Sequence, residues 1–199
     1  MIRVAVIRFP GSNCEPDAFR AVARAGGAPF YLFHRDSDLR DADAVILPGG
    51  FSYGDYLRAG AIARFSPIMA AIERHAADGR PVLGICNGFQ ILCESGLLPG
   101  ALERNAGLKY LSRPVDVRIE RIDTPFTSGY RQGEVIRIPI GHVDGRFSAS
   151  LETLAELEAN RQVVLRYAAG MTDAPANPNG ALNDIAAIAN REGNVVGMM

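Results

Sequence analysis

Short apolar runs separated by helical patterns constrain the fold of this chain more than any other feature. Four of these runs, all in the first half, are nearly continuous in apolar residues: Ile2–Phe9, Phe30–Phe33, Ala44–Leu47 and Pro81–Ile85. Strands buried on both faces have this character, because helices cover both faces of a parallel sheet. The sequence therefore predicts an α/β protein with a mostly parallel sheet.

Helical patterns lie between these runs. Asp17–Ala25 is followed by two glycines, and a second pattern begins near Ser66-Pro67, where Ser caps a helix and Pro fits its first turn, and ends before Gly79. This βαβα order predicts an open, doubly wound sheet with helices on both faces. Functional residues then gather at the carboxyl ends of the strands, where we expect Pro48-Gly49-Gly50 and Cys86 to lie together.

The second half of the chain has a different texture. Val115–Ile122 and Val135–Ile140 alternate apolar and polar residues, which favours a more exposed or antiparallel strand pair. An amphipathic helix from Leu151 to Glu158, the strand Val163–Tyr167 and two short strands around the turn Glu192-Gly193-Asn194 follow. With 199 residues and no repeat or linker, we expect one domain over residues 1–199.

Composition and charge exclude several function classes. The formal net charge is -1 and no basic run is present, which argues against a nucleic-acid partner. No apolar run approaches the ~20 residues that cross a bilayer, and no leader pattern opens the chain, so we expect no membrane contact and a cytoplasmic location. The 3 cysteines lack metal-ligand spacing, which argues against a zinc site.

One short stretch carries the chemistry. Gly84-Ile85-Cys86-Asn87-Gly88 lies between a predicted strand and the helical stretch Phe89–Glu94, in the order of a nucleophile elbow with Cys in place of Ser. The turn is so tight that the residues two before and two after the nucleophile must be small, and both are Gly. At a helix N-terminus, the helix dipole and free amides favour a thiolate. A buried structural Cys beside a glycine turn is the alternative.

Nearby residues complete a candidate site. Gln90 follows Cys86 by four residues, so its amide projects toward the sulfur side of the helix and suits a small polar substrate, unless it is an ordinary surface or inter-helix Gln. Gly49 and Gly50 let backbone amides approach a ligand, although a glycine pair after a strand is often only a turn. The amides of Gly50 and Asn87 together form a candidate oxyanion hole.

These pieces resemble the class I glutamine amidotransferases, with their flavodoxin-like fold. The resemblance narrows to PurQ-type glutaminase subunits of phosphoribosylformylglycinamidine synthase and spans the whole chain. It rests on RFPGSNC at 8–14, LPGGFSYGDYLRAGAIA at 47–63, GICNGFQIL at 84–92, GLLPGAL at 96–102, IPIGHVDGRF at 138–147, NPNGALNDIA at 177–186 and GNVVGMM at 193–199.

The resemblance implies a function and its partners. Cys86 would form a thioester with glutamine and release ammonia, while Gly49, Gln90 and His142 would bind the glutamine. The ammonia would pass to a large PurL-type synthase subunit that converts formylglycinamide ribonucleotide to formylglycinamidine ribonucleotide in purine synthesis, with a small PurS-type assembly subunit. ATP and Mg are expected in the synthase, and no cofactor in this chain.

The chain departs from the family pattern in two places. The family's catalytic His and Glu are expected beyond Met199, in a natural C-terminal segment that this sequence lacks. His142-Val143-Asp144-Gly145 stands where the family usually has His-Gly-Glu-Gly. Two alternatives stay open: a catalytically silent binding subunit of the same complex, or another cysteine-elbow hydrolase of this fold, such as the deglycase and chaperone group.

Overall fold

The structure is a computed structural model that describes residues 1–169 and 176–199. The chain forms two compact units, Met1–Leu97 and Leu98–Met199, which we call unit 1 and unit 2. No helix in the described part of the chain is both long and apolar enough to span a membrane. The expectation of one domain over residues 1–199 stays a prediction.

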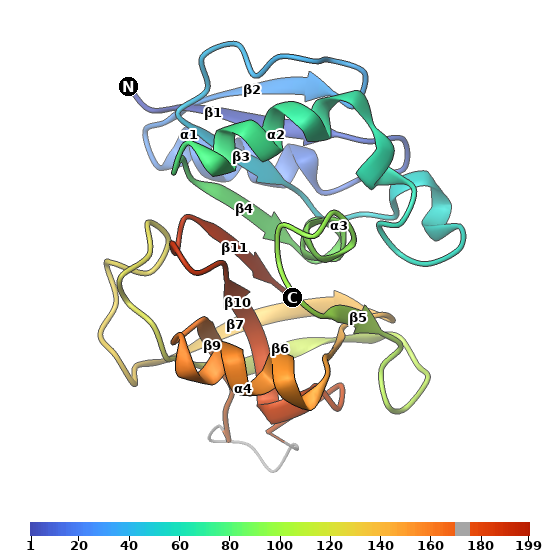
Figure 1. Cartoon of the computed structure of the whole chain (residues 1–199), viewed down its shortest axis with the longest axis vertical. Coiled ribbons are helices and arrows are strands. Elements are labelled where there is room, and N and C mark those ends of the chain that lie inside the picture. Colours follow the sequence, from blue (N-terminus) through green and yellow to red (C-terminus); the bar gives the residue numbers. More distant parts are fainter. Residues whose placement is uncertain (170–175) are drawn as a thin grey trace. The chain divides into compact units, whose positions relative to one another are not determined.

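Unit 1 contains a parallel sheet (Figure 1). Its strands lie in the order β2-β1-β3-β4, and each neighbouring pair is parallel. Their bounds are β1 Arg3–Arg8, β2 Ala28–Phe33, β3 Ala44–Leu47 and β4 Val82–Ile85. All four expected strands are confirmed, and only β2 begins earlier than its apolar run, because Ala28 pairs with Arg3 of β1.

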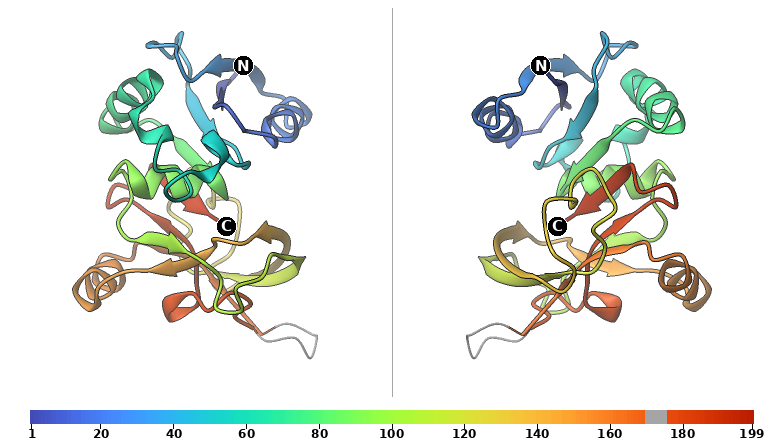
Figure 2. Two further views of the ribbon diagram at one scale, coloured as in Figure 1. Left: turned by 90° about the vertical axis from the view of Figure 1, so that its right-hand side faces the viewer. Right: turned by 90° about the vertical axis from the view of Figure 1, so that its left-hand side faces the viewer.

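Helices cover both faces of this sheet, as expected (Figure 2). On one face lies α1 (Glu15–Arg24), and on the other lie α2 (Pro67–Ala77) and α3 (Asn87–Glu94). Two short 3-10 turns, η1 (Ser52–Asp55) and η2 (Ala63–Phe65), lie between β3 and α2. α2 begins directly after Ser66, with Pro67 in its first turn, and α3 begins two residues earlier than its apolar pattern because Cys86 is its N-cap.

Unit 2 is built on antiparallel strands. Five lie in the order β11-β10-β9-β6-β7, while β5 and β8 form a separate antiparallel pair. The elements are β5 Ala101–Glu103, β6 Leu111–Ile119, β7 Val135–His142, β8 Arg146–Ser148, α4 Leu151–Ala159, β9 Val163–Tyr167, η3 Leu182–Asp184, β10 Ile185–Ala189 and β11 Val195–Met198. The expected α/β fold is thus confirmed, together with the antiparallel pair β6 and β7.

One expectation for unit 2 was inaccurate, and two short strands had no prediction. β6 covers residues 111–119 instead of 115–122, because its ladder with β7 begins at the pair Leu111 and His142. β5 and β8 have three residues each, which is too short to show an alternating pattern. Strand pairing, which depends on residues distant in the sequence, set these boundaries.

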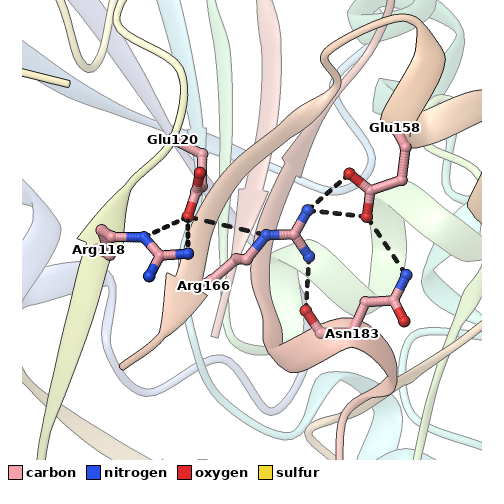
Figure 3. A network of polar contacts seen from close by, with 5 residues as sticks. All are labelled: Arg118, Glu120, Glu158, Arg166 and Asn183. Carbon is pink, nitrogen blue, oxygen red and sulfur yellow. Dashed lines mark hydrogen bonds and ion pairs between the residues drawn. The ribbon is translucent and has the colours of Figure 1, made fainter. Parts of the chain in front are cut away.

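A polar network ties several elements of unit 2 together (Figure 3). Arg166 of β9 pairs with Glu158 of α4 at 2.7 Å and donates from Nη1 to the carbonyl of Asn183 in η3 at 2.6 Å. Glu120, just after β6, pairs with Arg118 at 2.6 Å and lies 3.7 Å from Arg166 Nε. Guanidinium groups suit this linking role because they offer five N–H donors in one plane.

Candidate functional site

Cys86 occupies a sharp turn between β4 and α3. Its backbone has φ 52 and ψ −106, in a region that a residue with a Cβ rarely adopts. Such a conformation costs roughly 1–3 kcal/mol and persists only when the surrounding structure holds it. Cys86 is the N-cap of α3, and its side chain is partly exposed. The strand, nucleophile and helix order expected of an elbow is confirmed.

The two glycines that flank this turn are required by space. A Cβ on Gly88 would lie 2.0 Å from the carbonyl oxygen of Leu47 in β3. A Cβ on Gly84 would lie 2.5 Å from Leu92 Cδ1 and 2.7 Å from the backbone of Gly88. Both distances are far below van der Waals contact, so the prediction that these positions must be small is confirmed.

The glycine loop after β3 lies against the elbow, as expected. The Cβ position of Gly49 is 3.5 Å from Cys86 Cβ and 3.3 Å from the sulfur of Cys14. Gly50, with φ 146, forms an isolated antiparallel bridge with Ser12, and a Cβ on it would lie 2.7 Å from Ser12 Cα. The position of Cys14 near this loop was not predictable, because nothing in its spacing indicated it.

Burial controls the acidity of the candidate nucleophile. It raises the pKa of the Cys86 thiol to about 11, while a hydrogen bond from the Asn87 backbone N–H acts in the opposite direction. The negative charge of Asp55 raises the pKa further. The thiolate that the helix N-terminus was expected to favour is therefore scarce at neutral pH, because removal from water outweighs the backbone donor. The sulfur needs a base to become a nucleophile.

Two amide side chains are buried beside the elbow. The Nδ2 group of Asn87 donates to Gln90 Oε1 at 2.9 Å, and Asn87 Oδ1 accepts from the Ser52 N–H at 3.1 Å. Both Asn87 and Gln90 are largely inaccessible to solvent. The surface alternative for Gln90 is therefore wrong. The contacts of the Asn87 side chain were missed, because only its backbone amide had been considered.

His142 lies in unit 2, at the end of β7, and its ring is held by Asn105. Asn105 Nδ2 donates to the carbonyls of Lys109 at 2.9 Å and His142 at 3.0 Å. Its Oδ1 must therefore face His142 Nδ1, 3.1 Å away, so Nδ1 carries the hydrogen. No sequence pattern had pointed to Asn105, because its partners come from separate loops.

The tautomer of His142 makes its other nitrogen an acceptor. Burial lowers the pKa of the imidazole to about 4, so the ring is neutral at pH 7. Nε2 is buried and has no hydrogen-bond partner within residues 1–169 and 176–199. Buried polar atoms usually have a partner, which makes Nε2 of His142 a candidate for binding an N–H donor.

The other two histidines belong to unit 1. His34 Nδ1 lies 2.7 Å from the hydroxyl of Tyr53, which agrees with a structural role. His75 is buried in α2, where burial lowers its pKa. The apolar residues Ile68, Met69 and Ile72 set the buried side of α2, and this side extends to His75.

Comparisons with known proteins identify the family of this chain. The model of the CobB/CobQ-like glutamine amidotransferase domain matches residues 1–199. The phosphoribosylformylglycinamidine synthase subunit PurQ of Rubrobacter xylanophilus is 54% identical over 198 residues, covering 100% of this chain and 87% of that protein. The subunit of the same name from Chlorobaculum parvum is 55% identical over 201 residues, covering 100% of this chain and 80% of the relative.

A solved structure gives the same result. The PurLQS structure from Thermotoga maritima contains a chain that is similar with a TM-score of 0.88 and 44% identity, covering 99% of this chain and 85% of that one. The match therefore includes the elbow, the glycine loop and the His142 segment alike. The chain belongs to the CobB/CobQ-like glutamine amidotransferase family and, within it, to the PurQ-type subunits.

Proposed function

We propose that this chain hydrolyses glutamine to glutamate and ammonia through a thioester on Cys86. The observation that carries the proposal is the elbow: a partly exposed cysteine at φ 52, at the N-terminus of α3, with the Asn87 N–H directed at its sulfur. A nucleophile held this way reaches a carbonyl carbon while backbone donors face the oxygen of that carbonyl.

The proposed reaction has two steps. In the first, the Cys86 sulfur attacks the carboxamide carbon of glutamine, the backbone N–H groups of Gly50 and Asn87 hold the oxyanion, and the C–N bond breaks as the leaving nitrogen gains a proton. In the second, water attacks the thioester, glutamate leaves, and the thiol is restored. The close packing of Gly49 beside Cys86, with Gly50 next along the chain, supports this assignment of donors.

The first step needs a base, because the Cys86 pKa of about 11 leaves the thiol protonated at neutral pH. The three histidines of the chain are poor candidates for this role: His34 bonds to Tyr53, His75 is buried in α2, and burial lowers the pKa of His142 to about 4. We assign the base to the His of the family pattern, oriented by its Glu, and not to any of these three histidines.

Gly49, Gln90 and His142 are the proposed glutamine-binding residues. Gly49 offers close backbone approach, and Gln90 offers a buried carboxamide. The unpartnered Nε2 of His142 is an acceptor, which suits the ammonium or carboxamide N–H groups of glutamine. Val143 and Asp144, which depart from the family string, leave Gly145 in place next to the His142 ring.

The ammonia is proposed to serve a synthase partner. The relative from Thermotoga maritima was solved as PurLQS, and the names of other relatives refer to phosphoribosylformylglycinamidine synthase. We propose a PurL-type subunit, which uses ATP and Mg to make formylglycinamidine ribonucleotide, and a PurS-type subunit as the partners. No cofactor of its own is assigned to this chain.

Replacement of Cys86 tests the proposal. In the complex with the synthase subunits and ATP, Cys86→Ala is expected to abolish glutamate release from glutamine while ammonium chloride still supports synthesis. Cys93→Ala, on the same helix α3, is the matched control and is expected to keep glutamate release within about threefold. Equal glutamate release by Cys86→Ala and the unaltered chain would refute the assignment, and no release by the unaltered complex would favour the silent subunit.

A further inference from the structure

The segment of residues 51–60, which follows the glycine loop, is conformationally strained. Three of its residues other than glycine have positive φ: Tyr53 at 55, Asp55 at 54 and Leu57 at 69. Each such residue costs roughly 1–3 kcal/mol, so the segment keeps this shape only where neighbouring groups hold it. Contacts with the loop after β2, with α3 and with the side chain of Asn87 hold the segment.

Tyr53, near the start of the segment, is held by its hydroxyl group and by its backbone. This oxygen lies 2.7 Å from His34 Nδ1 and 3.0 Å from Ser66 Oγ. The Tyr53 N–H also donates to the carbonyl of Pro10 at 2.6 Å. Tyr53 thus links the strained segment to the loop after β2 and to the start of α2.

The second half of the segment is held by α3, the helix that Cys86 caps. Arg58 donates from Nη2 to Glu94 Oε2 at 2.7 Å, at the last residue of α3. A Cβ on Gly60 would lie 2.8 Å from the backbone nitrogen of Ile91, so the two backbones are in direct contact. The strained segment and the elbow helix therefore form one packed piece.

The first half is held by the side chain of Asn87, which is 1% exposed. Asn87 Oδ1 accepts from the Ser52 N–H at 3.1 Å, while Nδ2 donates to Gln90 Oε1 at 2.9 Å and to Asp55 Oδ1 at 3.5 Å. The amide thus uses both of its hydrogens and its oxygen. A backbone donor on one side and carbonyl and carboxylate acceptors on the other leave only one orientation for it.

We infer that the side chain of Asn87 is a positioning residue: it fixes the Gln90 carboxamide and the strained segment against the elbow. Because Gln90 Oε1 accepts from Asn87, the donor end of the Gln90 amide is directed away from Asn87. The direction of the Gln90 amide is therefore set before glutamine binds. This inference rests on the proposed function, since it assigns Gln90 its direction in the same site.

Only asparagine satisfies these contacts. Aspartate at position 87 keeps an acceptor for Ser52 but loses both hydrogens, and it adds a charge beside Asp55. Gln90 would then turn its NH₂ group toward residue 87 and present its oxygen in the opposite direction. Alanine leaves the Ser52 N–H and Gln90 Oε1 without these partners, which is unfavourable for buried groups.

The test measures glutamine kinetics in the complex with the synthase subunits. Asn87→Ala is expected to lower kcat/KM for glutamine by about 100-fold, since small displacements of reacting groups have effects of this size. Part of the loss is a rise in KM, because Gln90 loses the bond from Asn87 that directs its carboxamide. Asn160→Ala, at an exposed position after α4, is the matched control and is expected to change neither kcat nor KM by more than about twofold.

A double variant separates positioning from a general loss of structure. If Asn87 acts on KM through Gln90, the variant Asn87→Ala/Gln90→Ala has the same KM as Gln90→Ala alone. Native-state alkylation of Cys86 by iodoacetamide, resolved by peptide mass spectrometry, is expected to stay within about threefold of the unaltered rate, because the elbow remains folded. Unfolding of the variant would accelerate the alkylation of Cys86.

Any of three outcomes would overturn the inference. The first is a kcat/KM of Asn87→Ala within threefold of the unaltered chain, and the second is strongly accelerated alkylation of Cys86 in Asn87→Ala. The third is a KM of the double variant that exceeds the KM of Gln90→Ala by the same factor by which Asn87→Ala alone raises KM. Loss of the proposed function itself gives a different result. In that case the unaltered complex releases no glutamate, whatever stands at position 87.

Discussion

The glycines of the two units differ in which atoms an added methyl group would meet. In unit 1, the Cβ positions of Gly11, Gly50, Gly60 and Gly88 lie closest to backbone atoms of other segments, while those of Gly27, Gly49, Gly54 and Gly84 lie closest to side chains. In unit 2, those of Gly100, Gly141, Gly145 and Gly193 lie closest to side chains, which are Phe147, Tyr110, His142 and Arg121. A backbone cannot rotate away from an added methyl group, whereas a side chain can. The region of the candidate nucleophile is therefore the less tolerant of the two.

Gly88→Ala is expected to have the largest effect. Its Cβ would lie 2.0 Å from the Leu47 carbonyl oxygen, so α3 must move away from β3. We expect a loss of about 3 kcal/mol or more in the free energy of unfolding, measured by urea denaturation, and a drop of at least about 100-fold in glutamate release. Gly129→Ala is the control, because its Cβ would meet no atom within 4 Å. Equal stability of these two variants would contradict the comparison.

The close packing of unit 1 also predicts slow reaction of Cys86 with iodoacetamide. Burial raises its pKa to about 11, which disfavours the thiolate, so alkylation is expected to speed up about tenfold per pH unit from pH 7 to 10. At pH 8 the rate is expected to be about 100-fold below that of an unperturbed thiol. Peptide-resolved alkylation measures this directly. A plateau at or below pH 9 would show that the sulfur is not controlled by burial.

Gly145→Ala tests the same comparison in unit 2, where the added methyl group would meet a side chain. Its Cβ would lie 2.2 Å from Nδ1 and Cε1 of the His142 ring, and the ring must rotate out of its bond with Asn105. We expect a loss of roughly 1–3 kcal/mol in the free energy of unfolding, less than for Gly88→Ala. A rise in the imidazole pKa, followed by NMR, is expected because the displaced ring gains access to water. An unchanged pKa would mean that the ring has not moved.

Gly141→Ala is expected to have the smallest effect. The nearest atom to its Cβ position is the hydroxyl oxygen of Tyr110, at 2.8 Å, and Tyr110 is 55% exposed. The ring can swing into solvent, so we expect a change within about 0.5 kcal/mol in the free energy of unfolding. A destabilisation as large as that of Gly145→Ala would show that exposure of the neighbouring side chain does not decide tolerance.

Much of unit 1 was predictable from sequence because its signals are local. β1, β3 and β4 lie within nearly continuous apolar runs, and the Gly84 to Gly88 spacing around Cys86 follows from the geometry of a single turn. The pairing of β5 with β8 and the early start of β6 were not predictable, since both depend on partners about 30 to 45 residues away in the ladders.

In the candidate site, too, local features were predictable from sequence and features that depend on distant residues were not. Cys86, Gly49 and Gly50 were found from short motifs, but the raised pKa of Cys86 depends on how much water the folded chain excludes. The side chains of Asn87 and Asn105 went unnoticed because amides carry no distinctive chemistry of their own. Their importance comes from partners such as Ser52 and Lys109, which only the folded chain brings to them.

The single carboxamide of Asn105 limits which substitutions this protein can accept. It bonds simultaneously to the backbone at Lys109, His142 and Gly145, and it also decides which end of the imidazole carries a hydrogen. No other residue type offers two hydrogens and an acceptor at that reach. A substitution there would remove the side-chain bonds to two stretches of chain in one step, at Lys109 and in the 142–145 loop, so any altered form of this loop, natural or designed, has to retain this amide.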